Sequence, residues 1–528
     1  MREEKKQQNV LSSGCPMTIY PPLPLLELLS YTVVTLGVIG YITFCVLRSS
    51  LVDVDALNPY DFEPGWSFLD RKKDISNFEW RFWYELFLAI YPWYIGHVIL
   101  GKLAEWTFSQ YRKVAFIVYS LICLSNVMGW RIICLIFAHS FISFVSSKLK
   151  SKKLVWIVSL FLLTTLNFEP GISWIKSLTD DKDEEQTFYL FIFALALSNI
   201  RYTSFALEKC GAVDDKTSTR TESDNQEYTA DSLVDLALYI FYLPLFFTGP
   251  ILTYDLFSKQ FAMKLKWTKE RIVLNALNIL RMLFWALLNE LLLHYLYFGA
   301  LQQNRTVVAS ASLYTVAGIG YWQGQFFMNK YLVMFGLPSN IAKIDNFDPP
   351  KGPKCIAYIY LYSDMWKYFD CGLYRFLKRY IYVPLGGSQA GLLWQTIGSV
   401  CCFVFIFYWH GAEYYIFLWV LLNFVGVTME GLGKYCSKLP MISKFQTETI
   451  SPVSVRRLHA ALSVPIFLTS AFAIFCFFGG HDVGYVFFIR LIIEGWPVSW
   501  LSLSVFLYCP IQIAMEINRR QMLKQKTS

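Results

Sequence analysis

Charged residues are scarce in this chain. Only 16% of its 528 residues are Asp, Glu, Lys or Arg, whereas soluble domains average about 25%. A chain of this length cannot cover itself with a water-exposed surface from so few charges, so a soluble enzyme is excluded. Its 12 cysteines show no paired metal-ligand spacing, and most lie within apolar runs. They are therefore interpreted mainly as small buried hydrophobic residues.

Apolar residues dominate instead. They make up 55% of the chain, aromatic residues make up 18%, and apolar stretches of about 18 or more residues recur between Leu23 and Gln512, each long enough to cross a membrane core of about 30 Å. The pattern predicts an all-α polytopic membrane protein of about 10 to 12 transmembrane helices plus re-entrant or amphipathic helices. We expect a leader at 1–22, one membrane domain at 23–518 and a tail at 519–528. The stretch from Leu23 to Leu47 lacks a small-residue cleavage site, which favours a retained first helix.

The formal net charge of +8 does not indicate nucleic-acid binding, because the Lys and Arg residues lie in short runs between apolar segments. Such placement sets membrane topology. If the N-terminus is cytosolic, the positive-inside rule also places the basic stretches 148–153 and 519–526 in the cytosol, so both termini are predicted there. The predicted spans lie near 23–47, 81–100, 114–130, 131–147, 187–206, 272–298, 310–338, 392–410, 413–433, 459–478 and 498–517.

One apolar run is broken. Residues 233–257 contain Gly249-Pro250 and are followed by a basic loop, where a span entering from the cytosol should not end. Proline removes a backbone donor, and freed backbone groups inside a membrane need protein partners. The run is predicted to be either a re-entrant hairpin or a kinked ordinary span.

A carboxylate lies where it is costly. In a helix of about 100° per residue, residues 365–381 have an apolar arc that includes Trp366 and contains Asp370. A carboxylate there must find a partner, perform a function or take up a proton. A salt bridge to a neighbouring segment is the alternative to a catalytic role. The opposite face is basic, which suits either the phosphates of a ligand or anionic lipid headgroups; it carries Lys367, Arg375, Lys378 and Arg379.

An imidazole lies in a similar setting. His410 occurs in the run IFYWHGAEYY, and ionisable residues within membrane spans are rare and usually functional. Histidine can take up and release a proton near neutral pH, which suits a general base. A histidine merely hydrogen-bonded at a helix end is the alternative. If Asp370 and His410 serve one reaction, a cavity must run deep into the membrane.

Six stretches of the sequence carry a family resemblance. They are NIRYTSFALEKC, YLPLFFTGPILTYDLF, MWKYFDCGLYRFLKRYIYVPLGGSQAG, YWHG, LNFVGVTMEG and FFGGHDVG. Together they resemble the membrane-bound O-acyltransferases, and within this family most of all the branch that acylates Hedgehog-type proteins. The resemblance implies transfer of palmitate from palmitoyl-CoA to the N-terminal cysteine amino group of a secreted signalling protein of Hedgehog or epidermal-growth-factor type.

The same resemblance implies roles for single residues. Asp370 and His410 match the family's two active-site residues, Trp366 and Tyr382 match its acyl-CoA region, and Cys355 matches a haem-ligating cysteine, which implies haem b. Lys367, Arg375 and Arg379 are expected to bind the donor. The expected location is the endoplasmic reticulum membrane, with the Golgi as a second compartment.

Several functions remain open from the sequence. Asp370 is expected to orient the acceptor amine, and His410 to act as its base or to polarise the thioester carbonyl. The alternatives are a family member that acylates a lipid or serine hydroxyl, a catalytically silent relative, and a proton-coupled transporter that uses both residues as a relay.

Overall fold

The protein is almost entirely helical. The computed structural model describes residues 20–107, 109–178, 184–211, 230–263, 268–355 and 358–527. Within them, one small antiparallel sheet pairs β1 (Phe62–Pro64) with β2 (Lys72–Asp74). The leader predicted over 1–22 lies outside the described residues except for its end.

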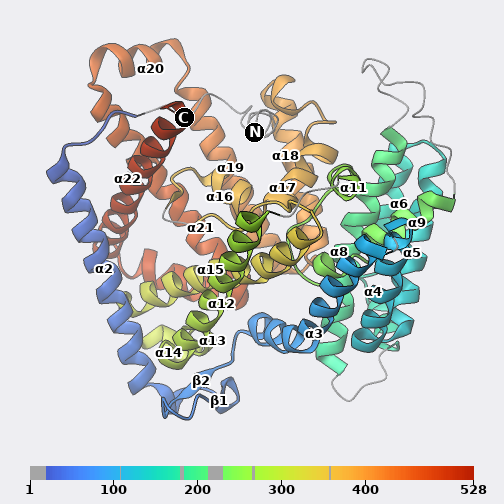
Figure 1. Ribbon diagram of the computed structural model, residues 1–528. Coiled ribbons are helices and arrows are strands. Elements are labelled where there is room, and N and C mark those ends of the chain that lie inside the picture. The colour runs from blue at the N-terminus through green and yellow to red at the C-terminus, as the bar shows by residue number, and fades with distance from the viewer. Residues whose placement is uncertain are drawn as a thin grey trace.

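The helices carry the labels of Figure 1. They are α2 (Leu25–Val52), α3 (Phe78–Thr107), α4 (Arg112–Met128), α5 (Trp130–Lys148), α6 (Lys152–Thr164), α7 (Glu169–Lys176), α8 (Glu184–Gly211), α9 (Ala230–Ile240), α10 (Leu243–Phe246), α11 (Tyr254–Ala262), α12 (Lys269–Tyr295), α13 (Phe298–Gln303), α14 (Arg305–Ser310), α15 (Leu313–Ile344), α16 (Tyr362–Phe369), α17 (Cys371–Leu377), α18 (Leu392–Trp409), α19 (Tyr414–Cys436), α20 (Pro440–Lys444), α21 (Pro452–Phe488) and α22 (Val498–Thr527). Single π-helical turns follow α17, α20 and α21.

Ten helices in the described part of the chain are long and apolar enough to cross a membrane, and the bent pair α6 and α7, which meet at 65°, would add an eleventh if it counts as one span. This confirms the predicted all-α, multi-pass membrane fold. One predicted span differs. Most of the span predicted at 310–338 lies in α15, and this helix is not among the ten. It carries polar side chains such as Asn329 and Lys330, which are buried inside the protein. Helix α22 continues through the predicted tail as far as Thr527.

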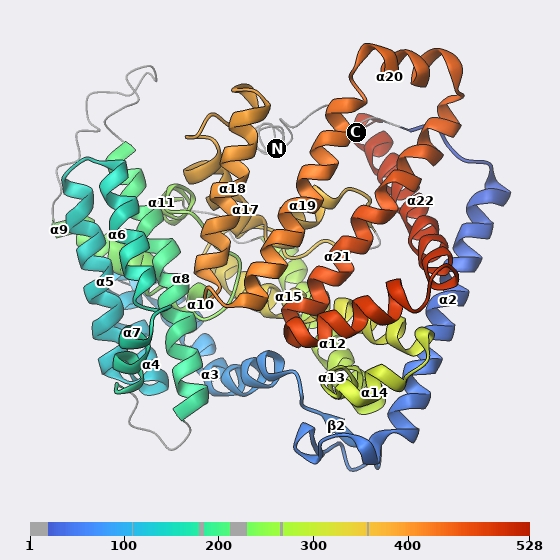
Figure 2. The ribbon, with the colours of Figure 1, turned by 180° about the vertical axis from the view of Figure 1, so that it is seen from behind.

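The helices form two groups with a central set between them. Figures 1 and 2 show α4, α5, α6, α8 and α9 gathered at one side, and α2 and α22 at the other. Helices α15 to α19 lie between the groups (Figure 2). Helix α8 is the most enclosed candidate span, whereas α2, α12 and α18 expose most of theirs. Exposed apolar helices of this kind are typical of a surface that faces lipid.

The broken run at 233–257 folds as a hairpin rather than as one kinked helix. It folds as α9, α10 and α11, and Gly249-Pro250 lies in the non-helical stretch between the last two. Gly249 adopts a φ of +122°, a backbone conformation that glycine reaches without strain. Helices α9 and α11 contact each other, so the chain enters and returns. The break predicted at Gly249-Pro250 is therefore present, and the run folds back on itself as the hairpin alternative requires. Its re-entrant position in a membrane stays a prediction.

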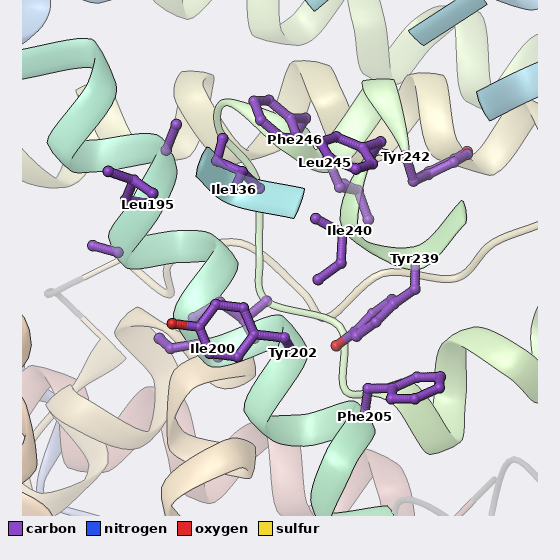
Figure 3. Close-up of a cluster of buried hydrophobic side chains, with 14 of the residues drawn as sticks. Ile136, Leu195, Ile200, Tyr202, Phe205, Tyr239, Ile240, Tyr242, Leu245 and Phe246 are labelled. Atoms are coloured by element: carbon purple, nitrogen blue, oxygen red, sulfur yellow. The ribbon is translucent and has the colours of Figure 1, made fainter. Parts of the chain in front are cut away.

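The backbone groups freed by this hairpin are satisfied by buried side chains. Arg201 of α8 donates hydrogen bonds to the carbonyl oxygens of Ile240 (3.3 Å), Leu245 and Phe246 (3.1 Å). The Tyr239 hydroxyl donates to the Leu252 carbonyl at 2.6 Å. Figure 3 shows the surrounding apolar side chains of α5, α8 and residues 239–246 packed together. These contacts supply the protein partners that irregular backbone needs inside a membrane.

Candidate active site

Asp370 lies at a break between two helices. The helical face predicted from Trp366 to Ile381 is interrupted at this residue, since α16 ends at Phe369 and α17 begins at Cys371. An Asp side chain competes for nearby backbone N–H groups and so favours a helix start. Here one carboxylate oxygen accepts a hydrogen bond from the Leu373 N–H at 2.8 Å. Asp370 forms no ion pair within the described ranges, so the salt-bridge alternative has no support.

The environment of Asp370 makes its charge costly. The pKa of this carboxyl is raised to about 6, because burial penalises the carboxylate, although hydrogen bonds from the backbone N–H groups of Leu373 and Gly372 partly oppose the shift. A carboxyl with a pKa near 6 is mostly ionised at neutral pH. The group can therefore hold a cation yet changes state within a mild pH range.

His410 lies at the end of a membrane helix. It caps the C-terminus of α18, and Gly411 and Ala412, with φ of +113° and +56°, turn the chain into α19. The imidazole ring contacts the edges of Trp419 and Phe477, with ring centroids 5.2 and 5.9 Å away. The imidazole makes no hydrogen bond to any of the described residues. The alternative of a histidine merely hydrogen-bonded in place is thus not supported.

Asp370 and His410 line the same cavity. Its volume is about 870 Å³, and its walls include α6 and α8 of one group together with helices of the central set, α15 to α19. Most lining side chains are apolar or aromatic, and the charged groups among them are Glu79, Lys330, Asp370 and Lys378. A joint role of Asp370 and His410 requires a cavity that both residues line, and the structure contains one.

The other predicted residues divide into two sets. Trp366 and Tyr382 line the cavity, and the Trp366 indole donates a hydrogen bond to Asn423 at 3.0 Å. Lys367, Arg375 and Arg379 are not part of its lining. Arg379 is instead bonded to both carboxylate oxygens of Glu208, at 2.6 and 3.0 Å.

Cys355 gives no structural support for a haem site. Its partly exposed thiol does not line the cavity of Asp370 and His410, and residues 356–357 lie outside the described residues. Over the described ranges, no group of three or more His, Cys, Asp or Glu side chains is arranged to hold a metal ion.

The cavity also contains an ion pair that the sequence interpretation missed. The Lys330 ammonium, whose side chain is only 1% exposed, pairs with the Glu79 carboxylate. Tyr331 donates a hydrogen bond to the same carboxylate at 2.6 Å. Lys330 could have been found, because it lies inside a predicted span, where ionisable residues are rare and usually functional. Glu79 gave no such signal, since it lies just before the span predicted at 81–100.

The fold and the cavity together describe an integral membrane protein with a cavity between its helices. The sequence model of the membrane-bound O-acyltransferase family matches residues 148–473, more than half of the chain. The chain therefore belongs to the membrane-bound O-acyltransferase family.

Three similar proteins carry related names. The mouse protein-cysteine N-palmitoyltransferase HHAT is 34% identical over 85% of this chain and 89% of its own length. The Drosophila melanogaster protein-cysteine N-palmitoyltransferase Rasp is 30% identical over 80% of this chain and 82% of its own. A mouse protein-cysteine N-palmitoyltransferase HHAT-like protein is 27% identical over 97% of this chain and 98% of its own length.

Proposed function

We propose that this protein transfers palmitate from palmitoyl-CoA to the amino group of an N-terminal cysteine on Hedgehog-type secreted proteins. The observation that carries the proposal is the single cavity lined by both Asp370 and His410. Two relatives of this chain, at 34% and 30% identity, are named protein-cysteine N-palmitoyltransferases. Membership of an acyltransferase family leaves the transporter alternative without support.

The chemistry requires positioning and proton removal. A thioester is already an activated acyl donor, whereas an α-amino group has a pKa of about 7.7 to 8.0 and is mostly protonated at neutral pH. The Asp370 carboxylate orients the incoming ammonium, which loses one proton to water and so becomes the neutral amine that can attack. His410 accepts a proton as the amine nitrogen bonds to the acyl carbon. The C–S bond then breaks, and the CoA sulfur leaves and takes a proton from the imidazolium.

The walls of the cavity suit the donor. Apolar side chains of α8 and α18, such as Phe193, Leu197 and Ile406, line it and offer dry contact to a 16-carbon chain. Lys378 is the basic residue of the 365–381 segment that lines the cavity, so it is placed to meet the phosphates of CoA. The basic residues outside the lining, Lys367 and Arg375, suit contact with anionic lipid headgroups.

The cellular setting follows the same proposal. We expect the protein in the endoplasmic reticulum membrane, or in the Golgi. The distribution of Lys and Arg between the apolar segments favours a cytosolic position for both termini. The acceptor then enters from the opposite side, where secreted proteins are found. Haem b at Cys355 stays a prediction of the family resemblance. Loss of a haem absorption band in Cys355→Ala would test it.

A direct assay tests the proposal. Purified protein is incubated with labelled palmitoyl-CoA and a peptide with a free N-terminal cysteine, beside the same peptide acetylated at its amino group. We expect an amide-linked label, resistant to hydroxylamine, on the free peptide alone. Equal labelling of both peptides would rule out amine acylation. Binding of palmitoyl-CoA without any labelling would instead indicate a catalytically silent relative.

A further inference from the structure

Part of the cavity wall is polar, in contrast to its mostly apolar remainder. Its polar side chains come from the stretch after β2, from α13 and from α15. They are Ser76, Asn77, Gln302, Gln303 and Gln323. Helices α13 and α15 pack against each other, so these residues form one region of the wall.

This polar region is held rigidly by a buried carboxylate. Asp74, only 1% exposed, accepts hydrogen bonds from the Ser76 N–H (2.9 Å) and the Ser76 hydroxyl (2.6 Å). Its other oxygen accepts from the Ala300 N–H of α13 at 3.1 Å. The Gln303 amide group also donates to the Ser76 carbonyl at 3.1 Å. The two parts of the wall are thus joined, which preorganises the groups that they carry.

Two carboxamides in this wall lack partners. The side-chain oxygens of Gln302 and Gln323 make no hydrogen bond in the described part of the chain, although the two residues are only 2% and 5% exposed. Buried polar side chains are normally hydrogen-bonded. Because both residues line the cavity, a ligand with N–H donors can supply the missing bonds. A carboxamide both accepts and donates, so it complements a peptide group of a main chain.

We propose that Gln302 and Gln323 bind the main-chain amides of the acceptor peptide that follow its N-terminal residue. The inference rests on the proposed function and extends it, because the enzyme then recognises a peptide rather than a single amine. The N-terminal amino group lies near Asp370 and His410, and the following residues extend along the polar wall. A free amino acid has no further peptide N–H to offer these carboxamides.

Kinetics with acceptors of increasing length test the inference. For the unmodified protein we expect kcat/KM to rise from cysteine amide to a cysteine-led pentapeptide. The double variant Gln302→Leu with Gln323→Met should lose roughly tenfold of that gain, as two hydrogen bonds predict. The KM for palmitoyl-CoA should stay unchanged. Gln325→Met is the matched control, because Gln325 lies on the same helix but outside the cavity lining.

A second acceptor series covers the case in which the double variant does not fold. In this series the unmodified protein is given the pentapeptide methylated at its second and third amide nitrogens. Its kcat/KM should lose the gain that the unmethylated pentapeptide shows over cysteine amide. An unchanged gain in either series would overturn the inference. If no peptide is acylated at all, the proposed function fails. Binding of fluorescent peptides to the protein and its variants then decides the inference alone, with equal affinities overturning it.

Discussion

Gly372 lies directly against the main chain of Ile251. A β-carbon at position 372 would be 2.3 Å from the Ile251 carbonyl oxygen and 2.6 Å from its nitrogen. Ile251 follows Gly249-Pro250 in the hairpin, and Gly372 lies in α17, the helix that begins directly after Asp370. The hairpin and the segment that carries Asp370 are therefore in backbone contact, which only glycine permits at this position.

The first prediction concerns this contact. Gly372→Ala should lower kcat/KM at least tenfold, because the added methyl group must push the Asp370 segment away from the hairpin. Small displacements of catalytic groups are costly. Gly431→Ala is the control, since a β-carbon there meets nothing within 4 Å. Equal activity of the two variants would show that the contact does not position Asp370.

The second prediction concerns pH. The Asp370 pKa is raised to about 6 by burial, and the proposed mechanism needs the carboxylate. Activity should therefore fall as pH drops through about 6, because the group becomes protonated. A separate limb near the acceptor amine's pKa of about 8 is expected. A pH profile of kcat/KM that shows only the amine limb, with no loss near pH 6, would contradict this role.

The third prediction concerns the ion pair between Lys330 and Glu79. Lys330→Met leaves a carboxylate in the cavity wall without its cation, and breaking a buried pair in this way costs about 3 to 5 kcal/mol. The double variant Lys330→Met with Glu79→Gln should recover most of that stability. Thermal unfolding in detergent measures both. If the double variant were no more stable than Lys330→Met alone, the loss of stability in Lys330→Met would not come from the broken ion pair.

The fourth prediction separates donor binding from lipid anchoring. Lys378→Met should raise the KM for palmitoyl-CoA several-fold, because Lys378 lines the cavity. Arg375→Met should change it little, although the sequence alone predicts Arg375 as a donor-binding residue. Arg379 is unsuitable for this comparison, since its removal also leaves Glu208 without its partner. A larger effect of Arg375→Met would restore the sequence-based assignment.

The sequence predicted those features that depend on local patterns. Apolar runs predicted the membrane fold, and Gly249-Pro250 indicated a break that could be re-entrant. The helix break at Asp370 could not be predicted from a periodic pattern, because the apolar arc continues through it while the Asp side chain redirects the backbone. The pairing of Glu79 with Lys330 and the contact of Gly372 with Ile251 join distant segments. Neither follows from the order of residues in one segment.

The central claim is that His410 removes the acceptor's proton inside the cavity that it shares with Asp370. The most direct measurement is the turnover of His410→Ala beside its palmitoyl-CoA affinity and thermal stability. We predict that turnover falls by about 10²- to 10⁴-fold while affinity and stability stay close to those of the unmodified protein. Full turnover in His410→Ala would contradict the account.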